Sequence, residues 1–301
     1  MKEKKIIEDS RELAKPFRIT KGKNFRLKDF DPAETGNFKP EDKARIKEAL
    51  ENGIQMLARL QDILYAQDRW AVLLVVQAMD AAGKDGVIKH VMSGVNPQGC
   101  QVYSFKNPSA IELDHDYLWR CNKCLPQRGH IGVFNRSYYE ETLIVRVHPE
   151  LLNQERIPKT LVTENLWDNR FHDIRSFERY LSRNGTVIRK FFLNVSADEQ
   201  KRRFLERLDN PVKNWKFSES DIRERAFWKK YRRAYQEMIK NTASPYAPWY
   251  VVPADNKWFT RLIVAGVLVE TLASLHLKYP EVTAEQHKAL LAAKKTLLAE
   301  R

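Results

Sequence analysis

The residues best suited to chemistry form a turn at positions 78–86, with the sequence AMDAAGKDG. An apolar run precedes this turn and a helical pattern begins at Val87. The backbone N–H groups of such a turn point, with the positive end of the following helix, at one place and bind phosphate. Lys84 adds a mobile positive charge that can follow a phosphoryl group. The alternative is a tight strand-to-helix turn with incidental charges, but the order strand, turn, helix favours phosphate binding.

The turn departs from the P-loop pattern G-x-x-x-x-G-K-[ST] at two positions, where Ala78 and Asp85 replace the first glycine and the hydroxyl residue. That hydroxyl normally contacts magnesium, so the metal needs another ligand. Asp80, inside the turn, is the obvious candidate.

A second group of polar residues follows the apolar run at 131–134. In P-loop enzymes the end of this strand supplies an acid for the metal, but this chain has Asn135 there. Arg136 can stabilise charge on a transferring phosphoryl group, and Glu140 lies one helical turn further on. The alternative is a helix cap, with Ser137 as N-cap and Glu140 completing a capping box.

A basic segment at 189–240 carries fifteen Lys or Arg residues against eight acids. Within it, about 208–228 contains a proline and has no clear period, which predicts a lid loop that closes over phosphates. A solvated charged face is the alternative, and the aromatic residues Trp215 and Phe217 weigh against it. The candidate phosphate-binding residues of this region are Arg203, Arg207, Lys213 and Lys216.

Hydrophobic periodicity predicts an α/β fold with a central parallel sheet, helices on both faces and a helical lid, a three-layer sandwich. Residues 1–40 read as an extended basic arm, and 41–301 as one domain that ends in a helix at about 283–301. This last helix could cap the domain or join subunits. The expected strands are 70–77, 101–105, 131–135, 186–195 and 249–253; the expected helices are 41–64, 109–125, 164–183, 197–207, 219–242 and 257–277.

The net charge of the chain limits the kinds of partner that we expect it to bind. The 301-residue chain has 52 Lys or Arg against 39 acids, a net charge of +13. This excess indicates a polyanionic partner, which means nucleic acid, an anionic membrane or a multiply phosphorylated substrate. Three cysteines are too few for a disulfide framework. The N-terminus has no signal-peptide pattern, and the longest apolar run (262–269) is too short to span a membrane, so we expect a cytoplasmic protein.

With these residues assembled, the sequence resembles the polyphosphate kinase 2 family over roughly 25–279. The motifs that carry the resemblance are LKDFDP at 27–32, QAMDAAGKDG at 77–86, GVNP at 94–97, DYLWR at 116–120, FNRS at 134–137, ERLDNP at 206–211, WKF at 215–217 and APWYV at 247–251. Many members carry Asp at the position of Asn135, and much of the family carries Asn at the position of Glu140. Both features look like the class that phosphorylates AMP as well as ADP.

The resemblance implies a P-loop kinase-like fold related to thymidylate kinase and dependence on Mg²⁺, with Mn²⁺ as a substitute. It implies reversible in-line transfer of the terminal phosphate of inorganic polyphosphate to AMP or ADP, which gives ADP or ATP. The implied partners are these substrates and a second copy of the chain in a dimer or tetramer, with no membrane and no nucleic acid. The implied catalytic residues are Asp80, Lys84, Arg136, Arg203 and Arg207; the implied phosphate or nucleotide ligands are Ala82, Gly83, Asp85, Gly86, Arg120, Asn135, Glu140, Lys213 and Lys216; and the implied metal ligands are Asp80 and Glu140.

Two other functions fit parts of the sequence. One is a nucleoside monophosphate kinase with ATP as donor, and the other is a P-loop protein that binds nucleic acid without catalysis. The acidic residues of the turn and the large basic excess are more than an ATP-only kinase needs. No helix-turn-helix, zinc finger or aromatic RNA platform accompanies the basic segment.

Overall fold

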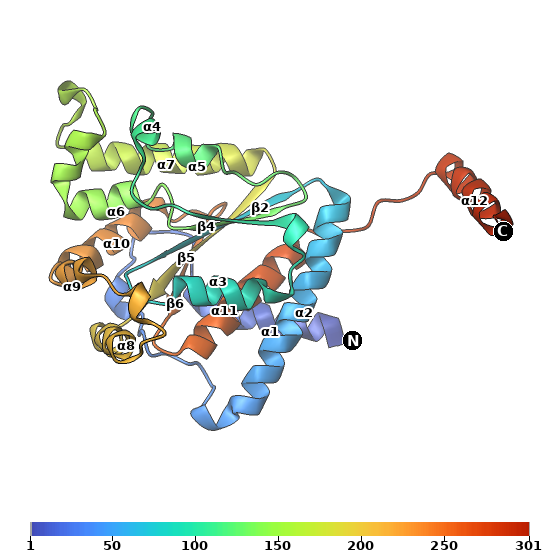
Figure 1. Cartoon of the computed structure of the whole chain (residues 1–301), viewed down its shortest axis with the longest axis horizontal. Coiled ribbons are helices and arrows are strands. Elements are labelled where there is room, and N and C mark those ends of the chain that lie inside the picture. The colour runs from blue at the N-terminus through green and yellow to red at the C-terminus, as the bar shows by residue number, and fades with distance from the viewer. Residues whose placement is uncertain (1, 301) are drawn as a thin grey trace.

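The computed structural model describes residues 2–300, apart from the side chains of Lys2, Pro40 and Lys216. Its centre is a six-stranded sheet in the order β1-β6-β5-β2-β4-β3 (Figure 1). Strands β2 to β6 run parallel, and the two-residue β1 is antiparallel to β6 at the edge. The strands are β1 (Arg18–Ile19), β2 (Ala71–Ala78), β3 (Cys100–Ser104), β4 (Ile131–Asn135), β5 (Thr186–Asn194) and β6 (Trp249–Pro253).

Helices cover both faces of this sheet, as predicted (Figure 1). On one face, α11 (Lys257–Ser274) contacts α1 (Lys2–Ala14), α2 (Lys43–Gln67) and α3 (Lys84–Val91). On the other face lie α6 (Glu140–Val147), α7 (Leu166–Arg183) and α10 (Trp228–Thr242). All eight residues of β2 are buried because layers of helix lie on both sides of the strand.

The carboxyl ends of the parallel strands meet the segment predicted to be a lid. There α8 (Ala197–Asp209) is followed by a 3₁₀ turn (Asn214–Lys216) and by α9 (Glu219–Arg225). The other 3₁₀ turns are Lys15–Phe17, Leu27–Asp29, Pro40–Asp42, Met92–Gly94, Pro97–Gly99, Pro149–Gln154 and Lys159–Leu161. In this type of fold, ligands bind outside the carboxyl ends of the strands.

The N-terminal segment differs from the extended arm that the sequence predicts. Residues Lys2–Ala14 form α1, and Arg18–Ile19 join the sheet as β1. Ile6, Leu13 and Ala14 recur at helical spacing and pack against the core, which stabilises a helix despite the many charges. Met1 lies outside the described residues.

Two predicted helices are each interrupted. The segment 109–125 contains two short helices, α4 (Ala110–Leu113) and α5 (Trp119–Asn122). The carboxylate of Asp116 accepts a hydrogen bond from the Leu118 N–H at 2.9 Å, a turn that competes with a continuous helix. The segment 219–242 is divided into α9 and α10. The last helix, α12 (Ala284–Ala299), stands apart from the body (Figure 1). Within residues 2–300, no helix combines the length and the apolar character needed to cross a bilayer.

Candidate active site

The predicted phosphate-binding turn connects the end of β2 at Ala78 to the start of α3 at Lys84. Two of its residues have left-handed backbone conformations, Ala81 at φ 60° and Gly83 at φ 105°. Glycine adopts this conformation without strain, whereas alanine adopts it at a cost in free energy. Strained backbone persists where the surroundings hold it in place, and it concentrates at functional sites.

Lys84 curls back over the turn. Its Nζ donates hydrogen bonds to the carbonyl oxygens of Ala78 at 2.8 Å and Met79 at 3.3 Å. Burial lowers the pKa of Lys84, and the neighbouring charge of Arg136 lowers it further. A phosphate group close to Nζ would raise the pKa again, because its negative charge stabilises the charged form of the lysine. The site of Lys84 therefore favours an anionic ligand.

Arg136 follows directly on β4 and links two of the predicted acids. Its backbone φ is 65°, again left-handed. Its guanidinium group reaches Asp80 (Nη2–Oδ1 3.1 Å) and Glu140 (Nη1–Oε2 3.6 Å). Burial lowers the pKa of Arg136, but the carboxylates of Glu140 and Asp80 outweigh this effect and raise it. The structure thus brings Asp80, Lys84, Arg136 and Glu140 into one cluster, hereafter the P-loop cluster.

Glu140 belongs to this cluster and not to a capping box. Helix α6 begins at Glu140, and its N-cap residue is Tyr139, without a side-chain cap. The Oγ of Ser137 instead accepts hydrogen bonds from Gln77 Nε2 at 3.1 Å and from Tyr139 N at 3.2 Å. The alternative of a capping box at Ser137 is therefore wrong. Burial raises the pKa of Glu140, and the charges of Arg136 and Lys84 oppose this rise.

Asn135 connects the end of β4 to the phosphate-binding turn. Its Nδ2 donates to Asp85 Oδ1 at 2.7 Å and to Ser104 Oγ at 3.3 Å. Its Oδ1 is buried without a hydrogen-bond partner. A buried acceptor without a partner in the protein is suited to a donor that a ligand supplies. Asn135 and Asp85 therefore form a second polar contact between the end of β4 and the phosphate-binding turn.

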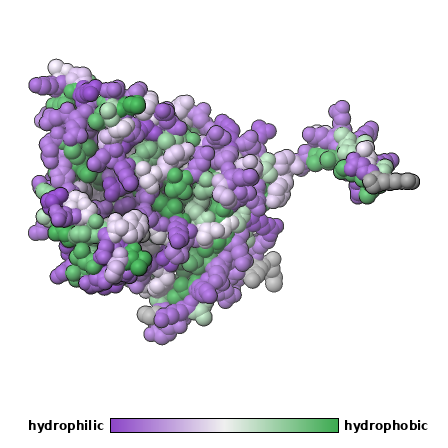
Figure 2. Space-filling view, in the orientation of Figure 1, coloured by the Kyte–Doolittle hydropathy of each residue, from purple (hydrophilic) through white to green (hydrophobic). Residues whose placement is uncertain are grey.

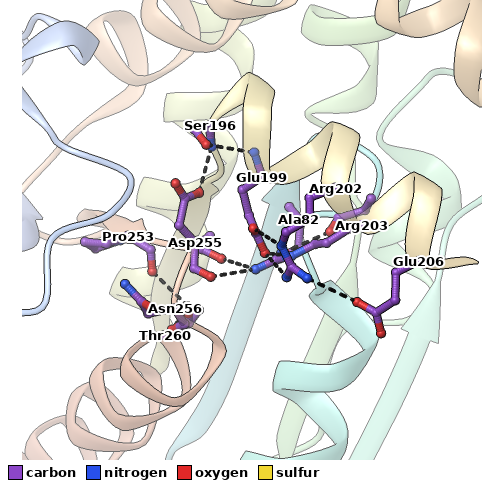
Figure 3. Close-up of polar contacts among 12 residues, drawn as sticks. Ala82, Ser196, Glu199, Arg202, Arg203, Glu206, Pro253, Asp255, Asn256 and Thr260 are labelled. Carbon is purple, nitrogen blue, oxygen red and sulfur yellow. Dashed lines mark hydrogen bonds and ion pairs between the residues drawn. The ribbon is translucent and has the colours of Figure 1, made fainter. Parts of the chain in front are cut away.

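Arg203, a predicted catalytic residue, is held by hydrogen bonds within the protein (Figure 3). The side chain is 4% exposed, and all its N–H groups are used. Nε donates to Glu199 at 2.7 Å, Nη1 to the carbonyls of Ala81 and Ala82 at 3.1 and 2.8 Å, and Nη2 to those of Ala254 and Asp255 at 2.6 and 3.0 Å. Arg203 therefore supports the turn through the carbonyl oxygens of Ala81 and Ala82. Sequence spacing could not reveal this, because it does not fix which neighbour an arginine on a buried helix face contacts.

Helix α8 contacts the turn, and the lid contacts α8, through residues that the sequence did not indicate. Gln200 Nε2 donates to the backbone oxygen of Asp80 at 2.9 Å, and Arg225 Nη1 donates to Gln200 Oε1 at 2.8 Å. Arg207 pairs with Asp221 of α9 at 3.6 Å. The only sequence signal is that Asp221 and Arg225 are four residues apart and so share one face of α9. Lys213 pairs with Glu206, and the side chain of Lys216 is not among those described.

Two cavities meet at the P-loop cluster. The smaller has a volume of about 70 Å³ and is lined by the turn, α6, α9 and α10. The larger, of about 700 Å³, extends from Phe105 across α6 to α7. The charged residues Arg136, Glu140 and Glu224 line both cavities, as does Ile144. The larger volume is within the range of small-molecule sites.

Arg120, a predicted nucleotide ligand, lies in the wall of the larger cavity. It is 7% exposed. Its Nη1 donates to the backbone oxygen of Lys106 at 2.8 Å, and its Nη2 lies 3.4 Å from Glu141 Oε1. Arg120 therefore lines the larger cavity, and its guanidinium group is paired with Glu141.

The carboxylate oxygens of Asp80 and Glu140 suit a divalent cation. Among residues 2–300, no group of three or more His, Cys, Asp or Glu side chains converges as a metal cage. Mg²⁺ is usually held by one or two carboxylates, substrate phosphates and water. The one-third exposed carboxylate of Asp80, in the turn, and the carboxylate of Glu140, which reaches Asp80 through Arg136, match that requirement.

Comparison with known proteins decides the family. A family model described as polyphosphate kinase 2 (PPK2) matches residues 40–280, well over half of the chain. The chain belongs to the polyphosphate kinase 2 family. The resemblance inferred from the motifs is therefore confirmed.

Relatives of this family match almost end to end. The ADP-polyphosphate phosphotransferase of Rhodopseudomonas palustris is 52% identical over 94% of this chain and 98% of its own length. The AMP/ADP-polyphosphate phosphotransferase of Meiothermus ruber is 44% identical over 92% of this chain and 99% of its own length. The crystal structure of polyphosphate kinase 2 from Arthrobacter aurescens superposes with a TM-score of 0.84 at 38% identity, covering 93% of this chain and 96% of that one. The P-loop kinase-like fold is thereby confirmed.

Proposed function

We propose that this protein transfers a phosphoryl group between inorganic polyphosphate and a nucleotide, AMP or ADP, in either direction. The observation that carries the proposal is the P-loop cluster, in which Lys84 lies in the phosphate-binding turn and Arg136 joins Asp80 of that turn to the wall of the larger cavity. Two relatives that match nearly the whole chain carry polyphosphate phosphotransferase names.

The attacking group in this reaction is a phosphate oxygen of the acceptor nucleotide, which is already anionic at neutral pH. No strong general base is needed, so catalysis depends on positioning and on the neutralisation of charge. Lys84 and the N–H groups of the turn hold the phosphoryl group, and Arg136 balances its charge. Asp80 and Glu140 would hold Mg²⁺, whose charge, when bound, offsets that of the phosphates. The basic lid, with Arg207 and Lys213, would hold the polyphosphate chain, and binding should weaken as salt rises.

The decisive experiment supplies long-chain polyphosphate and Mg²⁺ with either AMP or ADP and follows the nucleotides by chromatography. We expect ADP and ATP from AMP, and ATP from ADP. Product from ADP alone would refute AMP as an acceptor. No product from either nucleotide, together with transfer from ATP to AMP, would favour the ATP-dependent monophosphate kinase. Absence of all turnover would favour the binding protein.

Glu140 tests the choice of acceptor. The carboxylate lies beside Arg136 at the boundary of the two cavities. We propose that Glu140, with Asp80, supplies the negative charge that Asn135 lacks. The variant Glu140→Asn should lower kcat/KM for AMP at least about tenfold more than for ADP. Equal losses for both acceptors would show that Glu140 does not select the acceptor.

The same proposal includes a cytoplasmic location, where nucleotides are abundant, and assembly into a homo-oligomer. It gives no role to nucleic acid. A fluorescent oligonucleotide should therefore not compete with polyphosphate at physiological ionic strength. Competition by the oligonucleotide at equal phosphate concentration would contradict that exclusion.

A further inference from the structure

Helix α12 is exposed along its whole length (Figure 2). Four leucines project from it without cover: Leu290, Leu291, Leu297 and Leu298 are 57, 49, 66 and 76% exposed. Such a concentration of exposed leucine on a soluble helix indicates a surface that another surface covers.

The leucines lie on one face of α12, together with a basic residue. At 3.6 residues per turn, Leu290 and Leu297 form one row, Leu291 and Leu298 the next, and Lys294 lies between the rows. Lys295 and Lys288 flank this face. A lysine within a leucine face is costly against a purely apolar surface, because its charge would be buried without a partner. The face therefore fits a surface that is apolar and acidic.

The body of the protein has such a surface. A groove of about 1070 Å³ lies between α1, α2 and α11 and the segment 29–38, hereafter the acidic groove. Its apolar part includes Ile6, Leu13, Phe17 and Phe38. Six acids line it against two basic residues, although the whole chain carries a net charge of +13. The acids are Asp9, Glu12, Asp29, Asp31, Glu34 and Glu48.

We infer that the leucine face of α12 binds the acidic groove of a second copy of the chain. The chain leaves the body just after α11, where Leu275 and Leu277 still pack against the core, and residues 278–283 carry α12 away from it (Figure 1). An exchange of this helix between two copies makes the same contact twice around a two-fold axis and closes the assembly. Opposite charge on the two surfaces adds to the apolar contact and fixes the orientation of the helix.

Sedimentation equilibrium on the full-length protein tests the inference. Wild type should be dimeric. The variant Leu291→Glu/Leu298→Glu should raise the dimer dissociation constant roughly a hundredfold or more. The control Ala289→Glu/Thr296→Glu adds the same charge at the same seven-residue spacing on the opposite face, and should leave the constant within about threefold. A monomeric wild type, or equal effects of the two double variants, would overturn the inference.

Charge reversal distinguishes exchange between copies from docking within one copy. We expect Lys294→Glu/Lys295→Glu and Asp9→Lys/Glu48→Lys each to weaken self-association. In an equimolar mixture, the acidic helix of one variant meets the basic groove of the other, and the basic helix meets the acidic groove. Both contacts of the heterodimer are then complementary, so dimers should re-form. If α12 binds the groove of its own chain, mixing restores nothing. The inference rests on the homo-oligomer of the proposed function and names its interface. It is judged by mass and phosphotransfer is assayed separately in every variant, so failure of the interface and failure of the activity are distinguishable.

Discussion

Two clusters of charged side chains lie close to the sheet. They differ in how many of their hydrogen-bond donors and acceptors already have partners within the protein. In the P-loop cluster, Arg136 reaches its two acids at 3.1 and 3.6 Å, and Lys84 is held by loop carbonyls. In the second cluster, Lys190 and Glu178 are fully buried on β5 and α7 and lie 2.6 Å apart. Both contain a lysine whose pKa is lowered by burial.

The second cluster leaves nothing for a ligand. Lys190 Nζ donates to Glu178, to Tyr139 Oη at 3.0 Å and to the Thr242 carbonyl at 2.9 Å. Glu178 also accepts from the hydroxyls of Tyr138 and Tyr139 at 3.0 and 2.7 Å. A lysine has three donors, and all three are engaged. Complete hydrogen bonding marks a structural pair, whereas the 3.6 Å contact of Arg136, the strained backbone and the neighbouring cavities favour the P-loop cluster as the candidate functional site.

The largest effect on activity is expected from Lys84→Ala. Loss of this charge should lower the rate of phosphotransfer by about a thousandfold or more, because it acts on the transferring group itself. The thermal midpoint should change by no more than a few degrees. The control is Lys89→Ala, an exposed lysine on the same helix, which should keep normal rates. Near-normal rates in Lys84→Ala would remove the basis for a phosphate-binding turn.

The buried pair should show the opposite behaviour. Lys190→Met leaves the Glu178 carboxylate buried without a counter-charge and should lower the free energy of unfolding by about 3–5 kcal/mol. Denaturant titration measures this loss, and the KM of the folded variant for nucleotide should stay unchanged. Lys190→Met/Glu178→Leu should recover part of the loss, since no charge remains buried. A variant that is stable but has lost nucleotide binding would reverse the contrast between the two clusters.

Two arginines one turn apart on α8 sharpen the comparison. Arg203→Lys cannot replace five hydrogen bonds, so we expect a loss of about 1–3 kcal/mol in the free energy of unfolding and a slower reaction. Arg207→Lys, from a half-buried ion pair with Asp221, should change stability by less than about 0.5 kcal/mol. Paired denaturation curves and kcat values measure both. If Arg203→Lys altered KM for polyphosphate without any loss of stability, Arg203 would face substrate after all.

The sequence predicted those features of the fold and of the candidate site that depend on the local pattern of apolar and polar residues. The bounds of β4 and β6 are those expected, and Asp80, Lys84, Arg136 and Glu140 converge because parallel strands end at one edge of the sheet. It did not predict what depends on distant contacts. The support of the turn by Arg203 and the link from Gln200 to Asp80 join segments about 120 residues apart. The apolar residues of α1 are few and lie among many charged ones, so the sequence did not predict this helix. The helix is stabilised by its contact with α11, and no local pattern predicts where α11 lies.

The smallest expected effect concerns the cost of Glu140 to stability. Burial raises the pKa of Glu140 above its ordinary value of 4.5, so across the interval from there to the raised pKa the native state binds more protons than the unfolded state. Stability therefore falls as pH rises through this interval. Glu140→Gln removes this dependence and, at pH 8, should raise the free energy of unfolding by roughly 0.5–2 kcal/mol while lowering activity.

Denaturant titrations from pH 4 to pH 8 measure this difference, which should disappear toward pH 4, where both side chains are neutral. Glu164→Gln, an exposed residue, is the control and should follow wild type throughout. A Glu140→Gln variant that is less stable than wild type at pH 8 would contradict this. It would mean that the attraction of Arg136 and Lys84 stabilises the carboxylate by more than its burial destabilises it. The P-loop cluster would then resemble the Lys190–Glu178 pair, and the distinction between a cluster kept for function and one kept for stability would fail at Glu140.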